Sequence, residues 1–155
     1  MKRIVLAAAV LAIGTGIGIG SLAAQSGVSD KVIQRVKLMD QQGRALGTIG
    51  KMVRGQASYD QAAVDAAFTT LKDTSAKLPA LYTADAKGRA PDADYYASDK
   101  VWENKAEFDQ HFDDLQKAIA ANAGKVKDLD TLKPAVMAIG KACGGCHEDF
   151  RVKKS

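Results

Sequence analysis

The sequence predicts an all-α fold, an antiparallel up-down four-helix bundle, on three observations. Apolar residues recur at helical spacing in four separate stretches of the 155-residue chain. The links between these stretches are mostly short, which favours antiparallel neighbours. No stretch shows the alternating pattern of a half-buried strand, and no internal repeat is present. We therefore expect a single helical core with its apolar stripes facing inward.

The first predicted helix covers residues 29–54. Ser29 is placed to cap its start, and Gly55 follows its end, where glycine adopts a left-handed turn at little cost. Gly43 and Gly50 occupy two further places in the heptad-like series. The apolar members of that series are Val32, Val36, Met39, Leu46, Ile49 and Val53.

The second helix is predicted to begin with a capping box formed by Ser58 and Gln61 and to end at Pro79. Residues 79–97 show no sustained period, so we expect an irregular connection. A connection of this length is unusual in a compact domain. Its apolar and aromatic side chains suit it to cover one end of the bundle.

The third helix is predicted to be capped by Ser98 and to end near Gly124, and the fourth to start around Asp130. Pro134 is expected in the first turn of the fourth helix, where its missing N–H does no harm. Met52 and Met137 fall in apolar patterns and are expected to fill the core.

The residues Cys143-Gly144-Gly145-Cys146-His147 are the most specific motif of the chain. Cys-x-x-Cys-His is the spacing at which haem is attached covalently, and the chain has no other cysteine. Each thiol forms a thioether with the haem, and the histidine becomes an axial iron ligand. A redox dithiol is an alternative, although no strand pattern precedes Cys143. A zinc site is another, but it needs a fourth ligand.

The motif lies in the fourth predicted helix, so the geometry of that helix indicates where the haem lies. Cys143 and His147 are four residues apart and share one helical face. We therefore expect one covalent haem c along the inner side of this helix, as part of the core, with His147 as proximal iron ligand.

Residues 1–24 are predicted to be a cleaved signal peptide, and residues 25–155 to form the haem-binding domain. Lys2 and Arg3 precede an apolar run that ends in small residues. An uncleaved membrane anchor is the competing interpretation. The full chain has 22 basic and 18 acidic side chains. Removing Lys2 and Arg3 brings the mature domain close to neutral, which gives no support for a nucleic-acid partner.

The chain resembles the class II c-type cytochromes, the cytochrome c-prime superfamily, and is most similar to their low-spin cytochrome c-556 type. The resemblance extends over essentially the whole mature chain. It rests on Arg35-Val36-Lys37-Leu38-Met39, Gly55-Gln56-Ala57-Ser58-Tyr59-Asp60, Leu78-Pro79, Val101-Trp102 and Gly140-Lys141-Ala142-Cys143 to Arg151, of which the last is the most specific.

This resemblance implies roles for individual residues. Cys143 and Cys146 would carry the haem, and His147 would be the fifth iron ligand. Met39 would be the sixth ligand, as in the low-spin members, although some five-coordinate members also have methionine there. Arg35 would contact a haem propionate. His111, a possible sixth ligand, is expected to have a partly solvated role on the third helix instead.

The expected function is that of a periplasmic electron carrier, which is not an enzyme, with a His/Met-ligated haem c that cycles between Fe(III) and Fe(II). The alternative is a five-coordinate protein of the c-prime type that binds nitric oxide or carbon monoxide. Expected partners are periplasmic redox proteins, with no nucleic acid and no membrane span after signal removal. The chain is expected to be a monomer or a homodimer.

Overall fold

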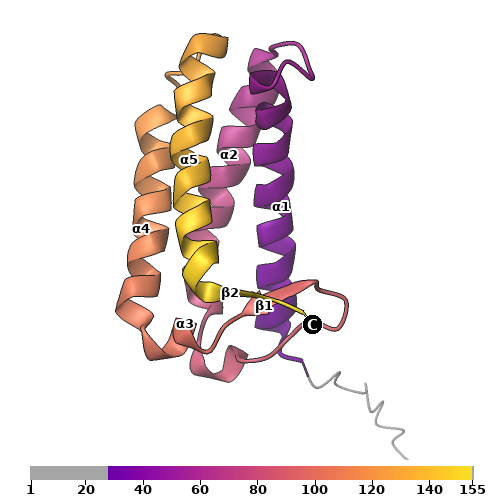
Figure 1. The fold of residues 1–155 in the computed structure, drawn as a ribbon, viewed down its shortest axis with the longest axis vertical. Helices are drawn as coiled ribbons and strands as arrows, with labels where there is room; N and C mark the ends of the chain where they lie inside the picture. Colours follow the sequence, from indigo (N-terminus) through magenta and orange to yellow (C-terminus); the bar gives the residue numbers. More distant parts are fainter. Residues whose placement is uncertain (1–27, 155) are drawn as a thin grey trace, which may run out of the picture.

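The computed structural model describes residues 28–154; the predicted signal peptide, residues 1–24, lies outside them. Four long helices lie side by side as a bundle (Figure 1). They are α1 (Asp30–Val53), α2 (Gln61–Lys77), α4 (Lys105–Asn122) and α5 (Leu129–Phe150). The prediction of an all-α up-down four-helix bundle is confirmed.

The connection between α2 and α4 contains short elements at the lower end of the bundle in Figure 1. These are the 3-10 turns η1 (Pro79–Leu81) and η2 (Ala84–Ala86), the strand β1 (Tyr95–Ala97) and the one-turn helix α3 (Lys100–Glu103). As expected, this connection covers one end of the bundle. At the other end, Gly55 and Gly124 have positive φ angles of 70° and 74°, which confirms their predicted role after α1 and α4.

The expectation of a chain without strands is wrong at one place. Strand β1 pairs antiparallel with β2 (Arg151–Lys153), which follows α5 directly, so that Tyr96 lies opposite Val152. The two strands have three residues each. Segments this short give no recognisable alternation in a sequence, and their pairing depends on the bundle bringing them together.

The second and third predicted helices differ from the prediction. The residue before α3 is Asp99 and not Ser98, and its side chain makes no capping hydrogen bond. Asp60, and not Ser58, caps α2, and its carboxylate accepts a hydrogen bond from the Ala63 amide at 3.1 Å. The third predicted helix is divided at Asn104, whose φ of −115° and ψ of 49° are not helical. The result is a single turn, α3, followed by α4.

The start of α5 has a capping box that the sequence pattern did not indicate. The Asp128 carboxylate accepts a hydrogen bond from the Thr131 amide at 2.8 Å, and the Thr131 hydroxyl accepts one from the Asp128 amide at 3.2 Å. Pro134 was predicted in the first turn of this helix, but it is the sixth residue of α5 and lies in the second turn. The proline therefore leaves the Asp130 carbonyl without its usual helical donor.

The core has two clusters, one toward each end of the bundle. The upper cluster joins all four long helices, and its fully buried members include Ile49, Leu71, Leu132 and Ile139. The lower cluster lies beside the two-stranded β1–β2 pair, called the ribbon below. It is mainly aromatic and consists of Leu78, Tyr82, Val101, Phe108, Phe112 and Phe150. Met39 and Cys146 pack against the lower cluster, so the predicted haem ligands reach this end.

The two methionines expected in the core behave differently. Met52 is buried in the upper cluster, as predicted. Met137 is 66% exposed, so the expectation for it is wrong. The buried stripe of α5 passes through Leu132, Ala135 and Ile139, and Met137 lies off this stripe. Among residues 28–154, no helix is both long enough and apolar enough to span a bilayer.

Candidate functional site

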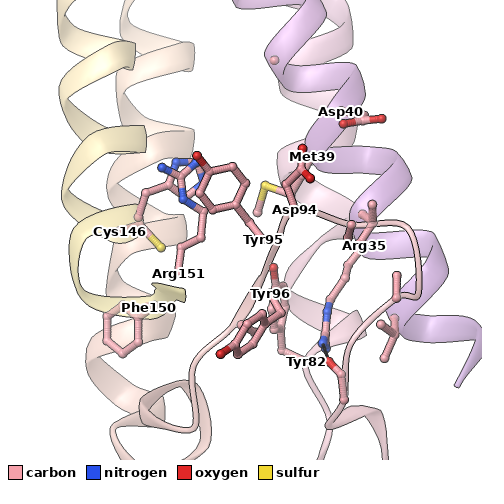
Figure 2. A pocket seen from close by; sticks show the side chains of 18 of the residues that line it. Arg35, Met39, Asp40, Tyr82, Asp94, Tyr95, Tyr96, Cys146, Phe150 and Arg151 are labelled. Carbon is pink, nitrogen blue, oxygen red and sulfur yellow. Dashed lines mark hydrogen bonds between the residues drawn. The ribbon is translucent and has the colours of Figure 1, made fainter. Parts of the chain in front are cut away.

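A cavity of about 600 Å³ lies at the lower end of the bundle, and residues of α1, α5 and the ribbon line it. Figure 2 shows the labelled side chains of α1 on one side of this space and those of α5 on the other. Its lining comprises Val32, Arg35, Val36, Met39, Asp40 and Gly43 from α1, Tyr82, Phe108, Cys146, His147, Phe150 and Arg151, and, from the connection, Gly88, Ala90 and residues 92–97.

The motif of α5 contributes Cys146 and His147 to this lining. Cys143 lies one turn earlier, half-buried, where it packs against the upper core cluster. Burial raises the pKa of the Cys143 thiol. Burial, with the charges of Cys143 and Asp149 adding to it, raises the pKa of Cys146 to about 11. Both sulfurs are therefore protonated thiols at neutral pH when they carry no substituent.

The His147 side chain is half-buried and belongs to the cavity wall. Burial lowers the pKa of the imidazole, and the nearby positive charge of Arg151 lowers it further. A lowered pKa favours the neutral ring at pH 7, which is the form that binds a metal through nitrogen. The side chain is therefore suited to act as an axial iron ligand.

The α1 wall of the cavity carries Met39, half-buried, together with Val32, Arg35 and Val36. These positions are three and four residues apart, so they share one helical face. In Figure 2 Met39 projects from α1 into the space that Cys146 faces from α5. The structure thus brings Met39, Cys146 and His147 to one cavity, as the sequence predicted.

Arg35 is only 4% exposed, and its guanidinium holds the connection against α1. Its Nη1 donates to the Ala86 carbonyl at 2.6 Å, and its Nη2 donates to the Gly88 carbonyl at 3.0 Å. The same group lies 5.0 Å from the ring centre of Tyr82 and 5.7 Å from that of Trp102. Besides lining the cavity, Arg35 therefore has a structural role that the sequence did not indicate.

Replacing Arg35 by methionine should lower the free energy of unfolding by about 2–3 kcal/mol, because the buried Ala86 carbonyl loses a charge-assisted donor. Chemical denaturation of the haem-loaded protein measures this. The matched control is Arg44→Met on the same helix, whose exposed side chain pairs with the exposed Asp40 at 3.7 Å. The control should change the stability by less than about 0.5 kcal/mol. Equal effects of the two substitutions would contradict the role given to Arg35.

The ribbon and the segment before it lie at the mouth of the cavity, and sequence reasoning missed most of these residues. The Arg89 guanidinium lies 3.7 Å from the centre of the Tyr96 ring, and that of Arg151 lies 4.3 Å from the Tyr95 ring. Lys154 Nζ donates to the Pro91 carbonyl at 2.9 Å. The adjacent Tyr95-Tyr96 pair was the only local signal in the sequence. These contacts hold an aromatic rim at the opening, where basic residues lie beside the carboxylates of Asp40, Asp92 and Asp94.

The floor of the cavity is aromatic. Tyr82 and Phe108 make an edge contact with ring centres 4.7 Å apart, and Phe108 makes another with Phe150 at 5.2 Å. Burial raises the pKa of Tyr82 to about 12, against the opposing influence of Arg35, so the phenol stays protonated. Trp102 packs beside this cluster, and its indole donates to the Thr83 carbonyl at 3.0 Å.

The residues present fit the haem that the sequence motif predicts. The cavity volume lies in the range of about 300–1,000 Å³ that is usual for cofactor sites. Its walls are mainly apolar and aromatic, with an imidazole and a thiol on one side and a thioether on the other. His111, the other histidine of the chain, lies between α4 and α5 beside Gly145 and is not among the residues that line this cavity.

Comparison with known proteins identifies the family of the chain. The family model described as Cytochrome C' matches residues 30–151. A relative named cytochrome c-556, from Rhodopseudomonas palustris, is 45% identical over 126 residues, which are 81% of this chain and 85% of the relative.

Solved structures share the fold. Cytochrome c' from Rhodopseudomonas palustris gives a TM-score of 0.74 at 40% identity, over 82% of this chain and 99% of that one. A nitric oxide complex of a cytochrome c prime mutant from Alcaligenes xylosoxidans gives 0.70 at 29% identity, over 80% and 95%. The chain therefore belongs to the cytochrome c' family of class II c-type cytochromes, is of the c-556 type, and has covalently bound haem c as its cofactor.

Proposed function

We propose that the protein is a periplasmic one-electron carrier, not an enzyme. In this proposal Cys143 and Cys146 hold haem c through thioether bonds, His147 is the proximal iron ligand and Met39 is the sixth ligand. One observation supports it above the others: His147 of α5 and Met39 of α1 line the same cavity from different helices. When bound, haem supplies an Fe(III)/Fe(II) couple.

The chemistry of the two proposed ligands suits electron transfer. Imidazole nitrogen and thioether sulfur are both neutral, and thioether sulfur favours the ferrous state and raises the reduction potential. Both side chains project from long helices of a packed bundle, so neither needs to move when the oxidation state changes. A site that reorganises little supports fast and reversible transfer.

Arg35 remains a proposed propionate ligand. It lines the cavity, and its guanidinium has donors beyond the two that bind the Ala86 and Gly88 carbonyls. Those two hydrogen bonds fix the plane of the group, and a fixed fork is well suited to a carboxylate.

The periplasmic location depends on the proposed cleavage of residues 1–24, which leaves residues 25–155 as the mature domain. At the cavity mouth the basic residues Arg89, Arg151 and Lys153 lie near Asp92 and Asp94, and in this proposal the basic side chains contact acidic groups of a redox partner protein. We propose a monomer or homodimer that binds such partners in the periplasm and needs neither nucleic acid nor a membrane span.

A five-coordinate haem protein that binds nitric oxide or carbon monoxide is the second candidate. The observation that favours it is the similarity to the nitric oxide complex of the Alcaligenes xylosoxidans protein. In this alternative Met39 fills the core beside the iron without binding it, and small ligands occupy the sixth position.

Absorption and magnetic resonance spectra of the purified protein test the choice between the two candidates. The electron-carrier proposal predicts low-spin iron in both oxidation states, with a ferrous form that does not take up carbon monoxide readily. A high-spin ferrous form that binds carbon monoxide at once would overturn it and favour the gas-binding candidate. The spectra must be recorded near neutral pH, where the His147 ring is not displaced by protonation.

A further inference from the structure

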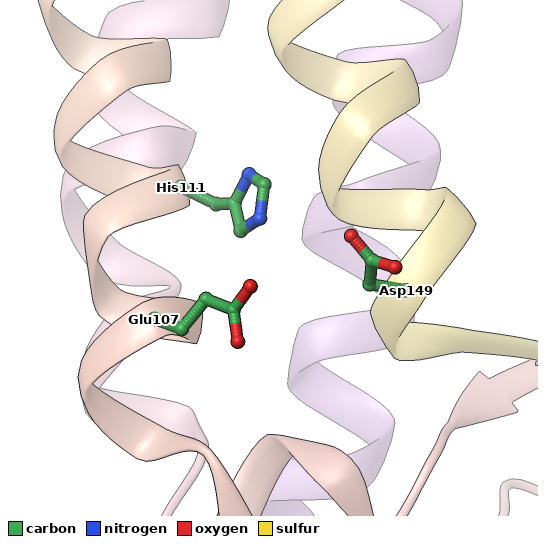
Figure 3. Close-up of side chains that lie close together, drawn as sticks. All are labelled: Glu107, His111 and Asp149. Carbon is green, nitrogen blue, oxygen red and sulfur yellow. The ribbon is translucent and has the colours of Figure 1, made fainter.

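Three side chains with metal-binding atoms meet between α4 and α5, outside the haem cavity (Figure 3). Glu107 and His111 are one turn apart on α4, and Asp149 faces them from α5. One ligand atom of each lies within 4.8 Å of the other two. A pair of ligands four residues apart on a helix, completed by a third from a neighbouring helix, is a common arrangement for metals in helical bundles.

The imidazole of His111 lies against α5. Its ring makes an edge contact with Phe150, with ring centres 5.5 Å apart at 72°. It also lies near Gly145, where a Cβ, if present, would be 3.7 Å from Cε1 and 3.9 Å from Nδ1. The ring is half-buried, whereas Glu107 and Asp149 are exposed. The site therefore offers one half-buried nitrogen ligand and two oxygen ligands open to solvent.

The carboxylates of this cluster make no short contact with a basic side chain in residues 28–154. Within residues 28–154, none of the three side chains is in an ion pair, whereas Lys105 pairs with Asp109 and Lys117 with Asp114 on the same helix. Asp149 also lies in the last turn of α5, where the helix dipole disfavours a negative charge. A bound cation would neutralise the two carboxylates, including that of Asp149 at this helix end.

We propose that Glu107, His111 and Asp149 bind one divalent first-row transition-metal ion of the zinc type, with water completing the coordination. Imidazole together with carboxylates selects zinc, copper or nickel over calcium and magnesium, which prefer oxygen ligands alone. Ligands around a tetrahedral ion with bonds of about 2.1 Å are roughly 3.4 Å apart. Rotation of the exposed Glu107 and Asp149 side chains closes the remaining distance. The site is independent of the iron ligands proposed above.

Zinc titration of the haem-loaded protein by calorimetry tests this proposal, after chelator treatment to remove bound metal. A thiol assay first verifies that Cys143 and Cys146 are not free to bind zinc. With His147 on the iron, His111 is the one other histidine in the chain. We expect saturable binding of one zinc ion in the micromolar range. X-ray absorption at the zinc edge should show one imidazole nitrogen, with the other ligands being oxygen, at about 2.0–2.2 Å.

Variants identify the ligands. His111→Gln and Asp149→Asn should each weaken binding by at least about tenfold, because even an outer partner of a zinc ligand is worth about 10–100-fold. Asp113→Asn is the matched control, since this exposed acid lies on α4 outside the cluster. Its zinc affinity should equal that of the unmodified protein. The proposal is overturned if zinc does not bind saturably up to about 1 mM, or if His111→Gln weakens binding no more than Asp113→Asn does.

Discussion

Replacing both Cys143 and Cys146 by alanine should yield a protein without covalent haem and with a much less stable bundle. Both sulfurs form thioether bonds in the proposed arrangement, so mass spectrometry of the double variant should show only the mass of the polypeptide. The cavity of about 600 Å³ would then contain no covalently attached haem. At about 24 cal/mol per Å³, an enclosed dry cavity of that volume costs on the order of 10 kcal/mol, comparable with the total stability of a domain.

The opening of the cavity to solvent makes the actual loss smaller, but its direction is the same. Thermal unfolding followed by circular dichroism measures it. Gly144→Ala is the matched control in the same motif, because a Cβ at this exposed helical position would have no atom within 4 Å. That variant should keep its haem and its stability. If the double cysteine variant carried the mass of one haem, the proposed attachment would be wrong.

Helical periodicity predicted the four long helices because each of them buries one continuous stripe. Ile49 and Leu71, expected to face the core, are fully buried. The helix starts were less predictable, since several residues near each start can cap. Ser58 and Asp60 both have a suitable side-chain oxygen, and only the backbone geometry selects Asp60. Periodicity therefore fixes where a helix packs more reliably than where it begins.

The ribbon could not be predicted from local pattern. Its two strands are short and far apart in the sequence, and they meet because α5 ends beside the connection. The rim residues follow from this pairing, so Arg89 and Arg151 could not be placed over Tyr96 and Tyr95 in advance. Such contacts between distant segments can be predicted only after the arrangement of the helices is known.

The centre of the site was predictable because its chemistry has fixed spacing. The motif indicated Cys146 and His147, and the resemblance indicated Met39; the structure places all three in the cavity wall. For Arg35, the resemblance gave a propionate role but no sign of its hydrogen bonds to the connection. The position of an arginine in the sequence does not show which acceptors its N–H groups will bind.

Replacing Met39 by leucine should convert the iron from low spin to high spin if Met39 is the sixth ligand. Leucine keeps nearly the same volume, so the packing against the lower core cluster is largely retained while the sulfur is lost. The ferrous form should then bind carbon monoxide. The reduction potential should fall by on the order of 100 mV, a modest part of the roughly 0.8 V over which axial ligands set it.

Met52→Leu is the control for this substitution, because Met52 is a buried methionine of the upper cluster and does not line the cavity. Its spectrum and potential should match those of the unmodified protein. Potentiometric titration with optical detection measures all three proteins under the same conditions. If Met39→Leu remained low spin with an unchanged potential, sulfur ligation would be excluded, and the role of Met39 would be that of a core side chain. A carrier function would then require another sixth ligand, and His111 lies outside the cavity wall.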